Sequence, residues 1–467
     1  MIPYFPKQIG ERAMLVYLIS LSLVSLVFVN YIMGLGYIAL GFFWVCGFFG
    51  MVALCSKGWR SFSEKRFVET IVMVGLALRI VWVIASYFFY EAVTGIPFEF
   101  SAADSLAYHD DAMWLASEPI SSTWRYLFGS VIMFADSGYP FILSIIYRIF
   151  GPIVIIPRII NALLSTWTCV LLYKMAARTF EEETARMAAI MMVFMPNLII
   201  YCGYHLKETL MLFLLVAGLE RIDALLRSKQ LSFWGVVVPS LLVGSLFLFR
   251  TVMGAAAVFA FASAILVSSA PSMKRGGKRI ALIAWGVLAL VVFAGGSIAT
   301  EVEEMWEGRE ENVVNKRAQQ AILGNQWAQY ATGTVMAPMI VVLPFATMVN
   351  VDEQYGQQAK SGGNFIRNFM GFFALLAIYE AIRRKKWRDF VLFGAFVVAY
   401  LGIVAFSGFS NSERFLLPGL PCLIVMWAYG VSSLRKATYK LLFPWCILVV
   451  AMEIGWAFFK IGSRGLF

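Results

Sequence analysis

Residues 67–89 read FVETIVMVGLALRIVWVIASYFF, and the chain then becomes polar and acidic at 104–111, DSLAYHDD. A membrane-spanning α-helix needs about 20 mostly apolar residues, so the first stretch predicts a span. Charged side chains are costly inside the bilayer, so the second stretch is expected outside it. Together the two stretches predict an all-α polytopic membrane protein with a polar site just outside its third span.

The composition supports this class. Of the 467 residues, 60% are hydrophobic and 14% are charged, whereas soluble domains carry roughly 25% charged residues. These values exclude a soluble enzyme, a disordered chain and a fibrous protein. The net charge of +10 comes mostly from short loops between apolar runs, so membrane topology explains it and no nucleic-acid partner is expected. The six cysteines form no C-x-x-C pair and are interpreted as small core residues.

Thirteen apolar runs are long enough to span a membrane, and two further runs, 127–151 and 334–350, are ambiguous. The thirteen lie near 13–33, 35–55, 67–89, 153–175, 186–202, 206–226, 232–249, 251–270, 279–298, 363–382, 389–407, 414–434 and 440–460. The first run is interpreted as a retained span rather than a signal peptide.

Basic clusters decide the two ambiguous runs, because cytoplasmic loops are rich in Lys and Arg. Such clusters occur at 57–66, 274–279, 383–388 and 435–440. Counting either ambiguous run as a span would move clusters to the outside. Both runs are therefore predicted to be re-entrant or interfacial helices on the outer side, with the N-terminus inside and the C-terminus outside.

Two long acidic loops fit this topology and divide the chain. Residues 90–125 hold six acids against one arginine, and residues 299–333 hold six acids against three basic residues. Loops of this length in a compact fold are usually functional. The predicted regions are two extra N-terminal helices with a cytoplasmic loop (1–66), a core with the first outer loop at 90–152 (67–298), a second outer loop with a re-entrant helix (299–362) and C-terminal helices (363–467).

The first outer loop holds the densest polar cluster. On a helix, Asp104, Tyr108 and Asp111 would share one face. Such carboxylates can share a proton, bind a cation or deprotonate a hydroxyl, and a solvated acidic surface is the alternative interpretation. His109 beside Asp110 and Asp111 makes a divalent metal cation a candidate cofactor, with Asp111 and His109 as its ligands.

Basic residues near the outer ends of several spans form a second constellation. They are Arg125, Arg158, Lys207, Arg250 and Arg414. Each alone could extend toward the interface to keep its charge hydrated. Their recurrence on one side favours a site for a phosphate, which Arg and Lys neutralise through charge-assisted hydrogen bonds.

Short motifs in a fixed order resemble the GT-C superfamily of membrane glycosyltransferases, in particular the bacterial branch related to protein O-mannosyltransferases and the lipid A aminoarabinose transferase. The resemblance runs from about residue 67 to the end. It rests on Ala77-Leu-Arg79, Asp104-Ser-x-x-Tyr108, Gly138-Tyr-Pro140, Tyr147-Arg-x-Phe-Gly151, Arg158-x-x-Asn161, Tyr173-Lys-x-Ala-x-Arg178, Pro196, Lys207-Glu208 and Glu413-Arg414-Phe-x-x-Pro418-x-x-Pro421. Without the two N-terminal helices, the eleven remaining spans place long loops after the first and seventh, as in that superfamily.

The resemblance implies transfer of a sugar from a polyprenyl phosphate, with inversion, to a hydroxyl of a glycan, lipid or protein acceptor. It implies that Asp104 is the base. Because Ser105 stands where the family often has a second acid, Asp110 and Asp111 are candidate partners of Asp104 or rivals for its role. Basic residues and Tyr108 would hold the donor. The expected location is the bacterial inner membrane, among membrane lipids, with the site on the periplasmic or extracellular side.

Two other functions remain open at this stage. A lipid-diphosphate-dependent glycan polymerase or ligase would depend on Arg and on His109 or His205 rather than on an early acid. A lipid or glycan transporter would place ionisable residues such as Arg79 and Glu453 near the midplane, usually in pseudo-symmetric halves. A structural scaffold is the least specific alternative.

Overall fold

Helices are the secondary-structure elements of the described part of the chain, and no strand is found there. The computed structural model describes residues 2–129, 134–230, 232–267, 339–351, 354–406 and 412–462, together with positions 280, 282 and 286. The α-helices are α1 (Lys7–Val27), α2 (Leu35–Gly58), α3 (Glu64–Thr94), α4 (Ala103–Ser117), α5 (Ile120–Gly129), α6 (Phe134–Phe150), α7 (Ile155–Thr179), α8 (Glu182–Phe194), α9 (Pro196–Ile200), α10 (Glu208–Arg227), α11 (Phe233–Ser245), α12 (Thr251–Val267), α15 (Tyr355–Ala359), α16 (Ser361–Arg383), α17 (Val391–Phe406), α18 (Glu413–Leu416), α19 (Leu420–Ser432), α20 (Lys436–Tyr439) and α21 (Leu442–Gly462).

Eight described helices are long and apolar enough to cross a membrane, and the bent pair α8–α9 makes a ninth if it counts as one span. The protein is therefore a multi-pass membrane protein. Helix α10 falls short of the criterion because it carries five charged residues, and α11 and α12 are short, at 13 and 17 residues. The predicted span 279–298, the basic cluster 274–279 and the acidic residues 299–333 lie outside the described residues, so the total of thirteen spans stays a prediction.

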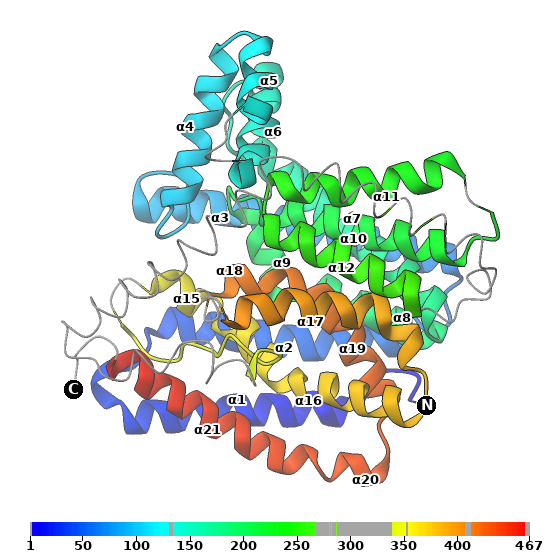
Figure 1. Cartoon of the computed structure of the whole chain (residues 1–467). Coiled ribbons are helices and arrows are strands. Elements are labelled where there is room, and N and C mark those ends of the chain that lie inside the picture. The colour runs from blue at the N-terminus through cyan, green and yellow to red at the C-terminus, as the bar shows by residue number, and fades with distance from the viewer. Residues whose placement is uncertain are drawn as a thin grey trace.

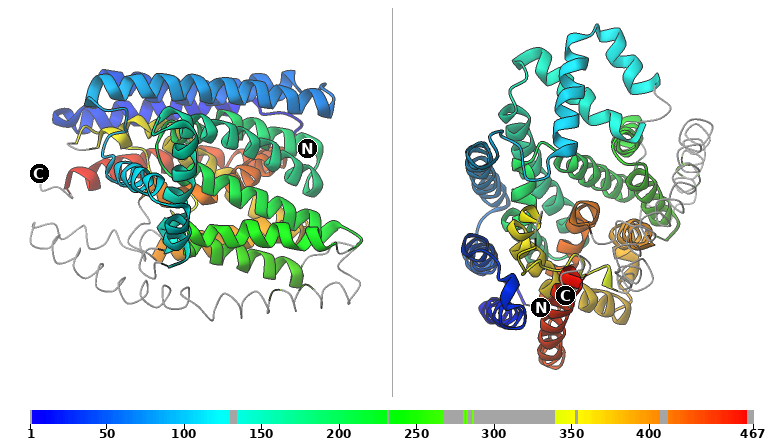
Figure 2. Two further views of the ribbon diagram at one scale, coloured as in Figure 1. Left: turned by 90° about the horizontal axis from the view of Figure 1, so that it is seen from above. Right: turned by 90° about the vertical axis from the view of Figure 1, so that its left-hand side faces the viewer.

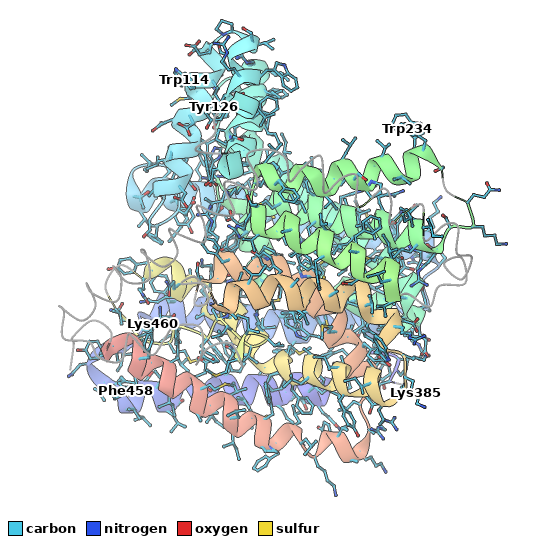
Figure 3. All side chains as sticks on the ribbon, in the orientation of Figure 1. Trp114, Tyr126, Trp234, Lys385, Phe458 and Lys460 are labelled. Carbon is cyan, nitrogen blue, oxygen red and sulfur yellow. The ribbon has the colours of Figure 1, made fainter. Side chains whose placement is uncertain are left out.

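Successive long helices run side by side in alternating directions (Figure 1). Helix α1 begins at the right-hand end of the bundle, where Lys385 also lies, and α21 ends at the left-hand end (Figures 1 and 3). At the right-hand end, hydrogen bonds and ion pairs connect the described basic clusters to neighbouring helices. Arg186 on α8 donates to the carbonyls of Trp59 and Arg60 after α2, and Arg435 pairs with Glu380 of α16. The extra helices α1 and α2 pack on α16, α21 and α8, so they are part of the same bundle.

Helices α4, α5 and α6 form an outer unit that stands across the direction of the bundle helices (Figures 1 and 2). The unit connects α3 to α7 at the left-hand end. Within the ambiguous run 127–151, residues 127–129 end α5 and residues 134–150 form α6, and neither helix is among those that could span a membrane. Gly138 is needed here because a Cβ at this position would lie 2.9 Å from the carbonyl oxygen of Leu248. The unit thus approaches the bundle closely just before α12.

Arg79, inside the span α3, stabilises a break between α8 and α9. Pro196 has no N–H, so it leaves the carbonyl of Met192 without its helical partner. Helices α8 and α9 are bent by 51° at this point. The fully buried Arg79 donates to the carbonyls of Met192 (3.4 Å) and Val193 (3.3 Å). These bonds compensate for the break, and the chain continues from it to Lys207 and Glu208.

The second ambiguous run differs from its prediction. Residues 339–351, the described part of 334–350, contain no α-helix, although a re-entrant helix was expected there. Pro344 limits helix formation, and side chains of the neighbouring spans bind the exposed backbone. Asn368 donates to the carbonyls of Val342 (2.5 Å) and Pro344 (2.9 Å), and Glu453 accepts from the N–H of Ala346 at 3.4 Å. Irregular chain at membrane depth is tolerated when protein groups satisfy it in this way.

Candidate active site

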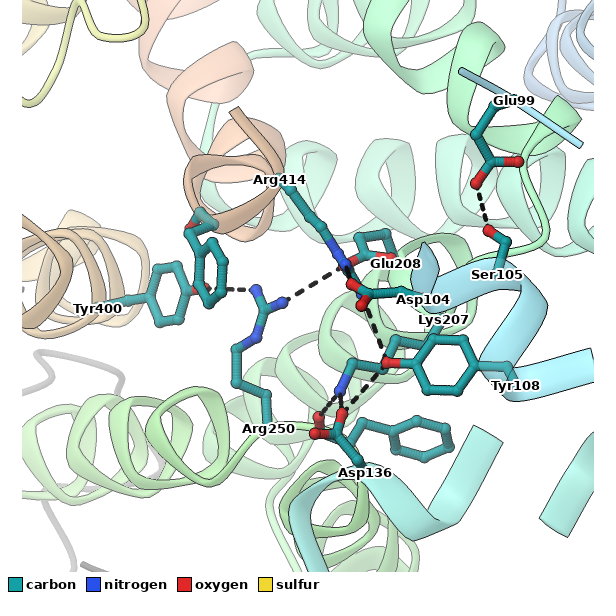
Figure 4. Close-up of polar contacts among 12 residues, drawn as sticks. Glu99, Asp104, Ser105, Tyr108, Asp136, Lys207, Glu208, Arg250, Tyr400 and Arg414 are labelled. Atoms are coloured by element: carbon teal, nitrogen blue, oxygen red, sulfur yellow. Dashed lines mark hydrogen bonds and ion pairs between the residues drawn. The ribbon is translucent and has the colours of Figure 1, made fainter. Parts of the chain in front are cut away.

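Six charged side chains from distant parts of the chain meet where the outer unit contacts the bundle (Figure 4). Three are acids, Asp104 on α4, Asp136 on α6 and Glu208 at the start of α10. Three are bases, Lys207 before α10, Arg250 before α12 and Arg414 on α18. We call these six residues the charge cluster. Asp104 and Arg414 are 310 positions apart in the sequence.

Arg414 is the centre of the cluster. Its Nη1 donates to Asp104 Oδ2 and its Nε to Glu208 Oε1. Its Nη2 also lies 3.4 Å from the hydroxyl of Tyr108. Because Glu208 is buried and Asp104 is exposed, the guanidinium joins a buried acid to an accessible one.

Arg250 is held beside the same buried acid. Its Nη2 lies 3.4 Å from Glu208 Oε1, and its Nη1 donates to the hydroxyl of Tyr400 at 3.2 Å. That hydroxyl in turn donates to the carbonyl of Phe415 at 2.9 Å. The guanidinium also stacks over the ring of Phe415, 4.3 Å from its centroid. These contacts fix the orientation of Arg250 toward the cluster.

Lys207 and Asp136 form the third part of the cluster. Lys207 Nζ pairs with Asp136 Oδ1 and donates to the carbonyl of Phe249 at 2.6 Å. Tyr108 donates its hydroxyl to the same Asp136 oxygen at 3.2 Å. Burial lowers the pKa of Lys207, and the Asp136 carboxylate opposes this by raising it.

The position of Arg414 is set by its neighbour Glu413. The Glu413 carboxylate accepts from Asn197 Nδ2 and pairs with Lys360 at 2.9 Å. Gly363 makes room for this arrangement, since a Cβ there would lie 1.9 Å from Asn197 Oδ1. The short helix α18 is thus fixed to α9 and α16, and the following Arg414 is aimed at α4.

The formal charges of the charge cluster cancel, three against three. Its cations are largely buried, whereas Asp104 and Asp136 are open to solvent. A buried cation needs a counter-charge, so an incoming anion can take over from an exposed carboxylate at little electrostatic cost. The arrangement can therefore bind an anionic group and, in doing so, release a carboxylate that can accept a proton.

The two histidines of the chain are His109 on α4 and His205 just before α10, and one tyrosine hydroxyl lies between them. Nδ1 of His109 is 2.7 Å from the hydroxyl of Tyr147, which is 3.1 Å from Nε2 of His205. Burial lowers the pKa of His109 and lowers the pKa of His205 well below its ordinary value. Both rings are therefore neutral near pH 7.

The structure does not assemble the predicted metal ligands. His109 and Asp111 are two residues apart on α4, about 200° around the helix. His109 binds Tyr147, whereas Asp111 accepts from Tyr126 at 3.4 Å. Within the described part of the chain, no group of three His, Cys, Asp or Glu side chains could hold a metal ion. The residues present do not fit a shared metal site, and no step is derived through one.

The structure places the other predicted residues apart from the charge cluster. Arg158 is fully buried at the start of α7, where it donates to the carbonyl of Pro97 at 2.5 Å. Arg125 is exposed on α5, and Asp110 is exposed on α4. Of the five predicted phosphate-binding bases, Lys207, Arg250 and Arg414 come together.

Sequence reasoning missed two acids of this cluster. Asp136 lies in a run interpreted only as apolar, although it stands two residues before the quoted Gly138-Tyr-Pro140 motif. Glu208 is named in the sequence only as part of the Lys207-Glu208 motif, without a role, whereas the structure shows that it binds Arg250 and Arg414. The available signal was an acid inside an apolar run for Asp136 and an acid at the start of one for Glu208.

The multi-pass helical fold agrees with the class that a family comparison shows, a membrane glycosyltransferase of the GT-C superfamily. A comparison with family models identifies the family: residues 121–462 match the Alg9-like mannosyltransferase family, and the chain belongs to it. The match confirms the predicted superfamily and includes every base of the charge cluster, whereas Asp104 precedes it. Comparisons with curated proteins and with solved structures gave no match.

Proposed function

We propose that the protein transfers a sugar from a polyprenyl-phosphate donor to an acceptor hydroxyl, with Asp104 as the base. The observation that carries the proposal is the contact of Arg414 with both Asp104 and the buried Glu208. The family description supports mannose as the sugar. The three described basic clusters, 57–66, 383–388 and 435–440, lie at the opposite end of the bundle, which supports a site on the extracytoplasmic side. The proposed location is a bacterial inner membrane.

Donor binding exposes the base in this mechanism. The Arg414 guanidinium binds one oxygen of Asp104. A donor phosphate competes for the same guanidinium and for the neighbouring Lys207 and Arg250, because charge-assisted bonds to phosphate are strong. The Asp104 carboxylate is then free to approach an acceptor hydroxyl within about 3 Å. The base thus becomes active only when the leaving group is in place.

The transfer step needs only the donor, the acceptor, Asp104 and the three bases of the charge cluster. The acceptor oxygen attacks the anomeric carbon from the side opposite the phosphate, and its proton passes to Asp104. The bond between the anomeric carbon and the phosphate oxygen breaks, and its electron pair stays on that oxygen. Lys207, Arg250 and Arg414 stabilise the negative charge that develops there. Displacement from the opposite side inverts the anomeric centre.

The test uses the purified protein in lipid nanodiscs with matched donors that carry one sugar. These are a polyprenyl-phosphate mannose, the corresponding polyprenyl-diphosphate mannose and GDP-mannose. We expect sugar transfer or donor hydrolysis with the monophosphate lipid, and the Arg414→Gln variant should bind it about 10- to 100-fold more weakly, the value of a charge-assisted bond. Turnover restricted to the diphosphate lipid would support the polymerase or ligase instead. Movement of intact donor across the bilayer without cleavage would support a transporter.

A further inference from the structure

A cavity of about 120 Å³ lies at the right-hand end of the bundle, where α8 begins (Figure 1). Its walls come from the end of α2, the start of α3 and the first turns of α8, and α2 and α3 each pack on α8. One water needs about 10–15 Å³ by the same measure, so the cavity has room for a small charged group. Half of its lining precedes the matched residues 121–462, so the family match does not account for it.

Arg186 on α8 is fixed in orientation beside this cavity. Its Nε pairs with Glu182 at 2.7 Å. Its Nη1 lies 2.8–3.2 Å from three carbonyls of the turn after α2, those of Trp59, Arg60 and Phe62. Among the described residues, its Nη2 makes no hydrogen bond or ion pair. The two N–H groups of Nη2 are therefore available to an anion in the cavity.

Two more charged residues line the cavity and have no partner for their side chains in the described part of the chain. Arg60 is exposed in the turn after α2, and Glu183 is half-buried in the first turn of α8. With the pair Arg186–Glu182, the charges that line the cavity cancel, two against two. The cavity thus offers two guanidinium groups to an anion and one carboxylate to a cation.

The depth of the cavity corresponds to the headgroup layer of a membrane. Helices α2 and α3 are both long and apolar enough to span a bilayer, and α2 ends at Gly58 while α3 begins at Glu64. The turn between them therefore lies where the chain leaves the hydrocarbon core and meets the lipid headgroups. Basic pockets between spans at this level are a recurrent place for lipid phosphates.

We propose that this cavity binds the headgroup of an ethanolamine phospholipid, with the phosphate on Arg186 and Arg60 and the ammonium on Glu183. Arginine forms strong charge-assisted bonds with phosphate, and a primary ammonium donates to a carboxylate in the same way. A choline headgroup has no N–H to donate. An anionic headgroup would leave the Glu183 carboxylate beside additional negative charge. The inference depends on the membrane location of the bundle and not on the proposed transfer reaction.

The bound lipid would connect parts of the chain of different origin. Arg60 belongs to the turn between the N-terminal helices and α3, whereas Arg186 and Glu183 belong to the part that matches the family. One headgroup that contacts all three side chains would hold α2 against α8 at the membrane surface. This gives the extra N-terminal helices a lipid contact in common with the rest of the bundle.

The test titrates the delipidated full chain in detergent with ethanolamine, choline and glycerol phospholipids of identical acyl chains and measures bound lipid by native mass spectrometry. We expect the ethanolamine lipid to bind about 10- to 100-fold more tightly than the other two, the value of a charge-assisted bond. Arg60→Gln should weaken binding of all three lipids, because all carry the phosphate. Glu183→Gln should lower the affinity for the ethanolamine lipid to that for the choline lipid, which should itself stay unchanged.

The matched controls are Arg66→Gln and Glu181→Gln, which remove exposed charges from the same two segments at positions that do not line the cavity. Both should bind the ethanolamine lipid like the wild type. Thermal unfolding without lipid should stay close to wild type in all four variants, which separates lost binding from lost folding. Equal affinity for the three lipids, or equal losses in the controls, would overturn the proposal. Competition by glycerophosphoethanolamine, the same headgroup without acyl chains, at the concentrations where the lipid binds would overturn a lipid as the occupant and assign the cavity to a soluble ligand.

Discussion

The two ends of the bundle both hold carboxylates paired with arginines, and the exposure of the partners is inverted between them. At the right-hand end, the side chain of Glu380 is 0% exposed, while Arg383 and Arg435 are 43% and 42% exposed. In the charge cluster, two pairs have the opposite arrangement. Lys207 is 5% exposed and its partner Asp136 is 51% exposed, and Arg414 is 19% exposed and its partner Asp104 is 58% exposed. The buried partner needs its counter-ion for stability, and the exposed partner is the one that a ligand or a proton can reach. The first end is therefore built to hold helices together, and the second is built to exchange an acid for another anion.

Neutralising Asp104 is expected to give the largest effect. Asp104→Asn should lower sugar transfer about 10²- to 10⁴-fold, because a general base contributes that much. Its thermal stability should stay close to wild type because the side chain is exposed and the Arg414 guanidinium keeps Glu208 as a partner. Initial rates with saturating donor measure the effect.

The control for Asp104 is Glu91→Gln, which removes an exposed acid from the last turn of α3 at the same end. It should retain wild-type rates. Near-normal turnover of Asp104→Asn would end the assignment of this residue as the base, even if the fold and the family stand.

Removing Arg414 from the charge cluster or Glu380 from the right-hand end should lower the free energy of unfolding. The loss should be larger where the charge that remains is buried. Arg414→Gln removes one of the two partners of the buried Glu208 carboxylate and leaves Arg250 at 3.4 Å, and breaking a buried ion pair costs about 3 kcal/mol. Glu380→Gln leaves arginines that water can reach, so about 1–2 kcal/mol is expected. Thermal unfolding in detergent compares the two variants. A larger loss for Glu380→Gln would contradict the inverted roles of the two ends.

The fold was predictable to the extent that hydropathy determines it. The apolar runs placed the helices at both ends of the described chain, and the basic clusters predicted their alternation. The irregular segment 339–351 was not predictable, because its stability depends on Asn368 and Glu453 side chains that bind its backbone. Arg79 showed the same limit: its partners are backbone carbonyls beside the break at Pro196, and no acid in the sequence marks them.

The site was predictable in its residue types and only partly in its membership. The chemistry of phosphate binding singled out Lys207, Arg250 and Arg414 from the sequence. Their grouping depends on contacts between residues that are far apart in the chain, so periodicity carries no information about which bases meet. The same limit explains why Arg158 was predicted with them, although it binds the carbonyl of Pro97 instead.

Lowering the pH should destabilise the end of the bundle that carries the charge cluster more than the right-hand end, because both histidines of the chain lie near the charge cluster. Burial lowers the pKa of His205, and Arg158 and His109 lower it further; burial lowers the pKa of His109, against Asp110. A lowered pKa means that the unfolded chain binds more protons below pH 6.5. Stability is therefore full above pH 6.5 and falls as the pH decreases toward the folded-state values, by up to about 1.4 kcal/mol per histidine per pH unit.

Hydrogen exchange measures the acid effect region by region. Between pH 7 and pH 5, exchange of α4 should increase relative to that of α16 once the intrinsic pH dependence is corrected. His205→Gln should reduce the increase. Uniform acid sensitivity along the chain would contradict a specific role for the histidines.

The smallest effect is expected from removing an exposed partner at the right-hand end. Arg383→Gln leaves Glu380 paired with Arg384 at 2.9 Å and with Arg435, so the buried carboxylate keeps its counter-charges. Exposed ion pairs contribute little because water and salt screen them, and we expect no measurable change in thermal stability or in transfer rate. The comparison with Asp104→Asn is then direct. Each variant removes one exposed member of an ion-paired cluster. Only Asp104→Asn should lose activity, because Asp104 takes part in the proposed chemistry and Arg383 does not. A loss of transfer in Arg383→Gln would mean that the right-hand end is coupled to catalysis.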